Sequence, residues 1–91
     1  MGAAKQAVTI INKRGLHARA SAKFVGAAAL MDGVKITVAK DGISAGGTSI
    51  LGLMMLGAAK GDTIEIAVEG DGAEARLNDL VEMVAGGFGE D

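Results

Sequence analysis

Gly15-Leu16-His17-Ala18-Arg19-Ala20-Ser21-Ala22-Lys23-Phe24 is the stretch around which the rest of the chain can be arranged. Gly15 allows the backbone to turn out of a preceding strand, and the residues from Ala18 onward are good helix formers. His17 is therefore predicted at or next to the N-cap of a helix, beside backbone N–H groups that have no partner within that helix. A helix start attracts anions, and Arg19 can add a charge-assisted hydrogen bond. The stretch thus predicts an anion site with a nucleophile beside it.

His17 is the only histidine in the chain. Taken alone, such a histidine is most simply a surface or capping residue, but its neighbours favour a second interpretation. A neutral imidazole is a good nucleophile near neutral pH, and the positive end of a helix disfavours the protonated ring. The backbone amides of Ala18 and Arg19, with the Arg19 guanidinium, could stabilise a transferred phosphoryl group. His17 is thus a candidate phosphoryl acceptor, and the residues alone do not decide which ring nitrogen accepts the group. For Arg19 the alternative is a solvated charge on the helix surface.

Two separated motifs resemble the HPr family of histidine phosphocarrier proteins from the bacterial phosphotransferase system. They are Lys13-Arg14-Gly15-Leu16-His17-Ala18-Arg19 and Thr48-Ser49-Ile50-Leu51-Gly52-Leu53-Met54-Met55-Leu56-Gly57. The nitrogen-related branch, NPr, is the closer likeness, and the similarity runs from residue 7 to residue 88. The resemblance implies that His17 receives phosphoryl at Nδ1 from enzyme I and hands it to an enzyme IIA. Ala20 stands where the family usually has proline, and alanine should preserve the first helical turn.

The composition fits one small domain over residues 1–91 and argues against several other classes of protein. The chain has no cysteine, which rules out disulfides and thiolate chemistry and fits a cytoplasmic location. A net charge of -2, with two phenylalanines and no tryptophan or tyrosine, argues against nucleic-acid binding. No run approaches the roughly 20 apolar residues that cross a bilayer. With no metal-binding cluster or nucleotide loop in the sequence, we expect a monomeric phosphoryl carrier that needs no cofactor and is not itself an enzyme.

Hydrophobic periodicity predicts strands and helices in the order β-α-β-β-α-β-α. The expected strands cover residues 5–12, 34–39, 43–44 and 63–69, and the expected helices cover 18–30, 50–57 and 73–84. In the first helix, Leu16, Ser21, Phe24, Val25 and Ala28 form the predicted core-facing stripe, and the Ser21 hydroxyl needs a carbonyl partner one turn back. Asp41-Gly42 predicts a tight hairpin. The glycine-rich residues 86–91 are expected to form a flexible tail.

These elements predict an α+β fold, a two-layer open-faced β-sandwich with helices on one face of the sheet. Periodicity leaves the order of the strands open. The HPr resemblance implies a four-stranded antiparallel sheet in the order 1-4-2-3, covered on one face by three helices.

The second motif supplies two further candidate sites. Ser49 is predicted to cap the helix that follows, and it aligns with the regulatory serine of the HPr family, which implies phosphorylation by HPr kinase/phosphorylase. A two-turn helix can bury only one side, so Leu53 and Leu56 are expected in the core. The other side would form an exposed surface typical of protein docking, made of Ile50, Leu51, Met54 and Met55. The alternative is that all of these side chains pack in the core.

Two other functions remain open at this point. The chain could be a regulatory interaction protein whose phosphorylation at His17 or Ser49 modulates a bound target without onward transfer. It could also be a small-molecule-binding α+β domain, although no convergent polar pocket can be read from the sequence. The ending Gly87-Phe88-Gly89-Glu90-Asp91 is similar to that of NPr and favours a regulatory relay over bulk sugar uptake.

Overall fold

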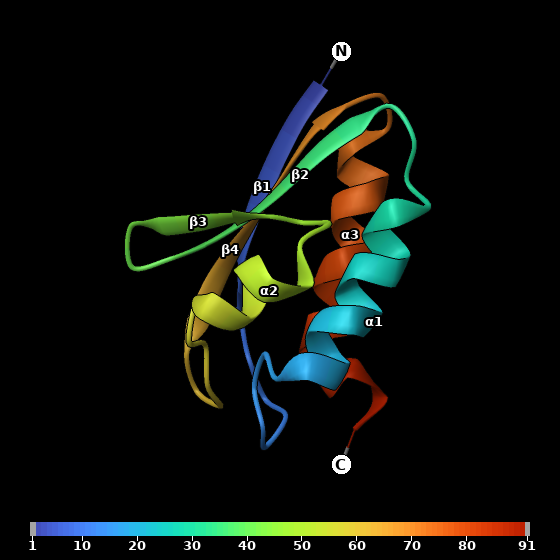
Figure 1. The fold of residues 1–91 in the computed structure, drawn as a ribbon. Coiled ribbons are helices and arrows are strands. Elements are labelled where there is room, and N and C mark those ends of the chain that lie inside the picture. The colour runs from blue at the N-terminus through green and yellow to red at the C-terminus, as the bar shows by residue number, and fades with distance from the viewer. Residues whose placement is uncertain (1, 91) are drawn as a thin grey trace.

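The computed structural model describes residues 2–90 and has two layers, a four-stranded antiparallel sheet and three helices on one of its faces (Figure 1). The strands are β1 (Gly2–Thr9), β2 (Val34–Lys40), β3 (Ile43–Gly46) and β4 (Thr63–Gly70), in the order β1-β4-β2-β3. The helices are α1 (Ala18–Ala29), α2 (Ile50–Met55) and α3 (Ala73–Ala85), followed by a 3₁₀ turn, η1 (Gly87–Gly89). The predicted open-faced sandwich is confirmed, and so is the strand order that the HPr resemblance implies.

The core lies between the sheet and the helices. Strand alternation turns Ile64, Ile66 and Val68 of the central strand β4 inward and leaves Glu65 and Glu69 exposed. The register places further buried residues directly opposite these, because Val8 pairs with Ile64, Val38 with Ile66 and Ile36 with Val68. From the helical layer, the side chains that close the core are Ala20, Phe24, Ala28, Leu53, Ala73, Leu77, Leu80 and Val84.

The hairpin between β2 and β3 forms where the sequence predicts it. Lys40 pairs with Ile43, and the two residues between them have positive φ values, 52° at Asp41 and 81° at Gly42. Two such residues in succession match the right-handed twist of the flanking strands. The third strand continues to Gly46, two residues beyond the predicted end.

The first strand differs from its prediction at both ends, since it begins at Gly2 and stops at Thr9. The buried residue Ile10 still bonds across to the loop before β4: its N–H donates to Asp62 O at 2.9 Å, and its carbonyl accepts from Gly61 N at 2.8 Å. Gly61, however, has a φ of 92°, so the chain opposite Ile10 is already turning. The regular ladder therefore ends at Thr9, three residues before the predicted end of the strand.

Helix α1 buries most of the predicted stripe, although Val25 is only partly buried. Ser21 is buried, and its hydroxyl donates to Leu16 O at 3.2 Å, which is five residues back. The carbonyl one turn back, at His17, instead accepts the Ser21 N–H at 2.9 Å. The predicted partner is therefore wrong by one residue, because the helix itself uses the nearer carbonyl.

None of the helices within residues 2–90 is long and apolar enough to cross a membrane.

The C-terminal segment is not a detached tail, contrary to the expectation for residues 86–91. After α3 the chain turns through η1 and returns beside the start of α1 (Figure 1). Phe88 inserts into the core and is 4% exposed, with a φ of 58° that is unusual for a residue with a side chain. Residues 86–90 are therefore part of the packed structure, while Asp91 lies outside the described residues.

The turn before α1 depends on a close approach between two segments of backbone. Leu16 N donates to Ala58 O at 3.0 Å, and Gly15 has a φ of 62°. A Cβ atom added to Gly15 would collide with Ala58 O and would lie 2.8 Å from Ala59 Cα. Only glycine fits here, so this residue fixes where α1 begins.

We expect Gly15→Ala to lower the free energy of unfolding by about 2 kcal/mol or more, because it combines a left-handed backbone with a backbone clash. Gly26→Ala is the matched control. Gly26 lies within α1 with open space around the added Cβ, so the same change should raise stability by about 0.5–1 kcal/mol. Urea unfolding of both variants checks this, and equal effects at the two positions would contradict the role assigned to Gly15.

Candidate functional site

His17 is the N-cap of α1, the position predicted from the sequence. Its backbone is extended, with φ −73° and ψ −179°, and its side chain turns back over the first helical turn. The Nδ1 atom accepts a hydrogen bond from Arg19 N at 3.2 Å. The imidazole thus occupies the place that an aspartate or serine side chain usually takes at a helix start, and it satisfies one of the unpaired amides there. The ring is 19% exposed, so it can still be reached from solvent.

The opposite edge of the ring faces a carboxylate that the sequence reasoning did not connect with it. The Nε2 atom of His17 lies 2.9 Å from Glu90 Oε2 and 3.2 Å from Glu90 Oε1. Because Nδ1 accepts from a backbone amide, its lone pair points at Arg19 N, and in the neutral ring the proton must be on Nε2. That N–H donates to Glu90. The two contacts together select one tautomer.

The surroundings of Glu90 stabilise its charged form. Partial burial by itself raises the pKa of Glu90, but hydrogen bonds donated by His17 and Asn12 oppose this, helped by the positive charge of Lys23. The net result is a Glu90 pKa below its ordinary value. Glu90 is therefore ionised at neutral pH.

The first turn of α1 supplies the predicted anion-binding groups. The amides of Ala18, Arg19 and Ala20 belong to the turn in which N–H groups have no acceptor within the helix. The Arg19 side chain is exposed beside them, whereas the Ala20 methyl group is fully buried. Alanine at this position therefore keeps the helical turn and contributes to the core.

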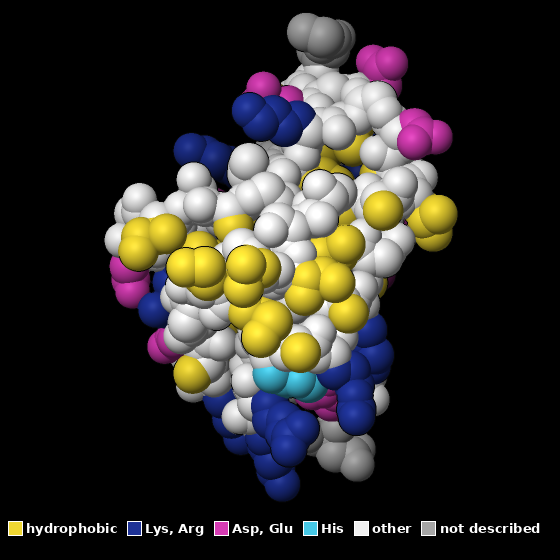
Figure 2. All heavy atoms as spheres, in the orientation of Figure 1, with side chains coloured by type: hydrophobic (Ala, Val, Ile, Leu, Met, Phe, Trp, Pro, Cys, Tyr) yellow, Lys and Arg dark blue, Asp and Glu magenta, His cyan; other side chains and the backbone are white. Residues whose placement is uncertain are grey.

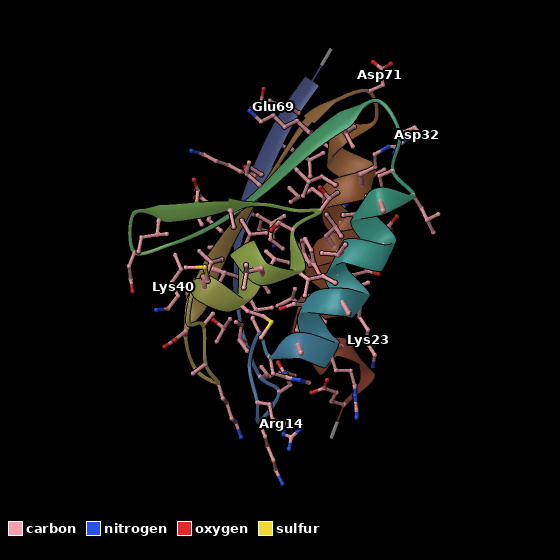
Figure 3. All side chains as sticks on the ribbon, viewed as in Figure 1. Arg14, Lys23, Asp32, Lys40, Glu69 and Asp71 are labelled. Atoms are coloured by element: carbon pink, nitrogen blue, oxygen red, sulfur yellow. The ribbon has the colours of Figure 1, made fainter. Side chains whose placement is uncertain are left out.

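Cations gather at the end of the molecule where α1 begins. Figure 3 places Arg14 and Lys23 at this end, and Asp32, Glu69 and Asp71 at the opposite one. In Figure 2 the histidine lies between a group of Lys and Arg side chains on one side and a hydrophobic area on the other. The distribution favours a negatively charged group at this end although the whole chain carries a net charge of -2. Within residues 2–90, no three His, Cys, Asp or Glu side chains are arranged to hold a metal ion.

Comparison with known proteins assigns this arrangement to a family. A family model described as "PTS HPr component phosphorylation site" matches residues 4–86. This chain belongs to the HPr family. An HPr phosphocarrier protein of Neisseria meningitidis is 48% identical over 87 residues, which cover 94% of this chain and 96% of that protein. A crystal structure of HPr from Thermoanaerobacter tengcongensis superposes with a TM-score of 0.90 at 36% identity, covering 97% of this chain and 98% of that one.

The relatives carry both names used within the HPr family. A phosphocarrier protein NPr of Shewanella violacea is 40% identical over 83 residues, covering 91% of this chain and 90% of the relative. Because that value lies below the 48% found for the meningococcal HPr, overall identity does not favour the NPr branch. Both relatives are named phosphocarrier proteins, and the family model is that of a component of the phosphotransferase system (PTS). The chain is therefore a phosphocarrier of this system.

The second HPr motif forms α2, and Ser49 is its N-cap. Ser49 is exposed, and its Oγ accepts from Gly52 N at 3.0 Å. Leu53 and Leu56 are buried, as predicted, and the interpretation that the whole motif packs in the core is wrong. The exposed side chains are Ile50 (41%), Leu51 (67%), Met54 (40%) and Met55 (74%), which we call the α2 surface. In Figure 2, hydrophobic side chains cover the area over α2 and extend toward the histidine.

We expect Glu90→Gln to destabilise the protein at neutral pH but not in acid. The pKa of Glu90 is lowered by folding, so its stabilising contribution is present above the ordinary carboxyl pKa of the unfolded chain. That contribution is lost as the pH falls through the lower pKa of the folded state. Denaturant unfolding of the two proteins between pH 7 and about pH 3 measures it. The difference between them should shrink on acidification, and a difference independent of pH would contradict the ionic contact.

Proposed function

We propose that His17 accepts a phosphoryl group from a phosphoenolpyruvate-dependent enzyme I and passes it to a histidine of an enzyme IIA. The observation that carries this proposal is the position of His17 Nδ1, 3.2 Å from Arg19 N at the start of α1. A nucleophilic nitrogen and the amides of a helix terminus are thereby held in one place. The family relationship supports the same reading. The chain would act in the cytoplasm as a monomer and without a cofactor, as a covalent intermediate in the reactions of other enzymes.

In the proposed transfer, the Nδ1 lone pair of His17 attacks phosphorus while the bond from phosphorus to the donor breaks. Nδ1 can then no longer accept from Arg19 N, and this amide becomes free to donate to a phosphoryl oxygen. The Ala18 amide and the Arg19 guanidinium add further donors for the negative charge. Phosphoryl transfer depends mainly on such positioning and charge stabilisation. Because an imidazole is a good leaving group, the same bond can break again when a second acceptor arrives.

The α2 surface is the docking area that we propose for enzyme I and enzyme IIA. Its four side chains, Ile50, Leu51, Met54 and Met55, project from a helix whose other side is anchored by Leu53 and Leu56. Methionine adapts its shape readily, which suits a surface that must fit several partners in turn. Its place next to His17 would bring the acceptor histidine of the partner to the phosphoryl group (Figure 2).

Ser49 is the regulatory site that we propose, with HPr kinase/phosphorylase as the enzyme that modifies it. The residue is exposed and borders the α2 surface. Phosphorylation there would add a charge of about −1.5 to −2 at neutral pH. The first turn of α2 could tolerate that negative charge. An apolar partner surface would not, because docking would remove the phosphate from water. Modification of Ser49 should therefore weaken docking without unfolding the protein.

We expect incubation with phosphoenolpyruvate, enzyme I and magnesium to produce an acid-labile, base-stable phosphoryl group on this protein. His17→Ala should abolish the labelling entirely, because no other histidine is available. Ser49→Ala is the control and should be labelled like the unaltered chain. Labelling that survives in His17→Ala would contradict the proposal.

Addition of an enzyme IIA to the labelled protein separates a carrier from a regulatory endpoint. The proposal requires the label to move to the enzyme IIA and the carrier to return to its unphosphorylated form. Retention of all label on this chain would favour the alternative, a regulatory protein that modulates a target without onward transfer.

We expect Leu51→Ser to reduce the rate of phosphoryl transfer to enzyme IIA about tenfold or more at limiting partner concentration. A fully buried leucine contributes roughly 1.5–3 kcal/mol to an interface, and every 1.4 kcal/mol corresponds to a factor of ten. Leu30→Ser is the matched control, since Leu30 is 84% exposed and lies at the far end of α1. A similar rate for both variants would exclude the α2 surface from docking.

A further inference from the structure

We propose that Met55, together with its neighbour Met54, is an oxidation site through which hydroperoxides weaken docking at the α2 surface. The inference rests on the proposed docking role of that surface and goes beyond it, because it assigns a way to regulate the surface. Met55 is 74% exposed and Met54 is 40% exposed, so both side chains are open to solvent. Met31 and Met83 instead lie partly buried against the core. Exposure therefore singles out the methionines of α2 within residues 2–90.

The composition makes methionine the side chain that a hydroperoxide attacks most readily in this protein. The chain contains five methionines and no cysteine, tryptophan or tyrosine. A hydroperoxide therefore meets no thiol that would react before a thioether. Methionine sulfoxide is reduced back to methionine by specific reductases, so the change is reversible. An oxidant that reaches this protein thus acts first on the side chains of the α2 surface.

The chemical step is a two-electron oxidation of sulfur. A lone pair of the thioether attacks the terminal oxygen of the hydroperoxide, the O–O bond breaks, and the departing oxygen keeps the bonding electron pair. That oxygen takes up the hydroxyl proton and leaves as water or an alcohol. The sulfur retains one oxygen atom as a sulfoxide, so the sulfur is oxidised and the peroxide is reduced.

A sulfoxide changes part of the α2 surface from apolar to polar. Its oxygen accepts hydrogen bonds from water while the protein is free, and docking against an apolar partner removes that water without supplying a donor. Ile50 and Leu51, which complete the surface, have no polar side-chain atom that replaces the lost bonds. Burial of an unpaired polar oxygen weakens an interface by about tenfold or more. Oxidation of Met55 therefore weakens docking.

The fold does not depend on the oxidised side chains. Helix α2 is anchored by Leu53 and Leu56, which are 0% and 6% exposed. Its N-cap bond, from Gly52 N to Ser49 Oγ at 3.0 Å, lies at the opposite end of the helix from Met55. An oxygen added on the solvent side leaves these contacts in place. The effect of oxidation is thereby confined to docking.

The first test uses the unphosphorylated protein and does not depend on the proposed function. The full chain is treated with dilute hydrogen peroxide, and peptide mass spectrometry with fragmentation follows each methionine separately. We expect Met55 to gain an oxygen about tenfold faster than Met31 or Met83, with Met54 between them, since access of the oxidant limits the rate. Urea unfolding of the oxidised protein should show the same transition as that of the untreated protein.

The second test measures phosphoryl transfer from this chain to an enzyme IIA at limiting partner concentration, after catalase has removed the peroxide. We expect oxidation to slow transfer by about tenfold, because docking is weakened. Treatment of the oxidised protein with methionine sulfoxide reductase and a dithiol should restore most of the lost rate.

Matched double variants identify the responsible sulfur atoms. Each variant is compared with its own untreated sample, so a difference in starting rate does not enter the result. Met54→Leu with Met55→Leu should lose the sensitivity to peroxide, because leucine has no sulfur to oxidise. Met31→Leu with Met83→Leu removes the same number of methionines elsewhere and should remain as sensitive as the unaltered protein.

The combined outcomes decide the proposal. Fast oxidation of Met55 with slower transfer, both absent from Met54→Leu with Met55→Leu, supports it. Equal oxidation rates at exposed and partly buried methionines overturn it, and so do an unchanged transfer rate after oxidation and a loss of transfer caused by unfolding. If the untreated protein is never phosphorylated, the proposed function fails instead, while the oxidation rates still report whether Met55 is the reactive sulfur.

Discussion

The hydrogen bond from Arg19 N to His17 Nδ1 is the contact on which the rest of the site depends. One ring both caps α1 and presents the nitrogen that we propose as the nucleophile. Phosphorylation must therefore remove the cap, and the phosphoryl oxygens must replace it as acceptors for the helix amides. The amides at the helix start exchange one hydrogen-bond acceptor for a stronger one and stay hydrogen-bonded. The fold therefore need not change between the unphosphorylated and the phosphorylated protein. An unchanged fold suits a protein that is phosphorylated and dephosphorylated repeatedly.

The fold places this ring at the end of the molecule and not in a cavity. Gly15 packs against the backbone at Ala58 and fixes the start of α1. Burial of Phe88 anchors the returning C-terminal segment to the core. The sheet and the three helices enclose the core, and the proposed phosphoryl site lies on the loop and helix ends that project from it. A carrier that must meet large partners gains from such an open position, because the phosphoryl group is reached by a protein surface and not by a small molecule. The α2 surface beside it provides the apolar area on which we propose that partners dock.

Local sequence signals predicted most of this arrangement. Period-2 alternation located β2 and β4, the Asp41-Gly42 pair located the hairpin, and Gly15 followed by good helix formers placed His17 at its cap. The C-terminal segment could not be found in this way. Glycines on both sides of Phe88 show no periodicity and are typical of a loose end, yet a single aromatic side chain that fits the core is enough to seat them. Glu90 was missed for the same reason, because its partner lies 73 residues away and only tertiary packing brings the two together.

The most direct measurement is phosphorus–nitrogen NMR of the phosphorylated, nitrogen-15-labelled protein. The account predicts a one-bond coupling between phosphorus and Nδ1 of His17, together with a large shift of the Arg19 amide resonance as that N–H transfers from Nδ1 to a phosphoryl oxygen. A phosphoryl group on Nε2, or an Arg19 amide that does not respond, would contradict it.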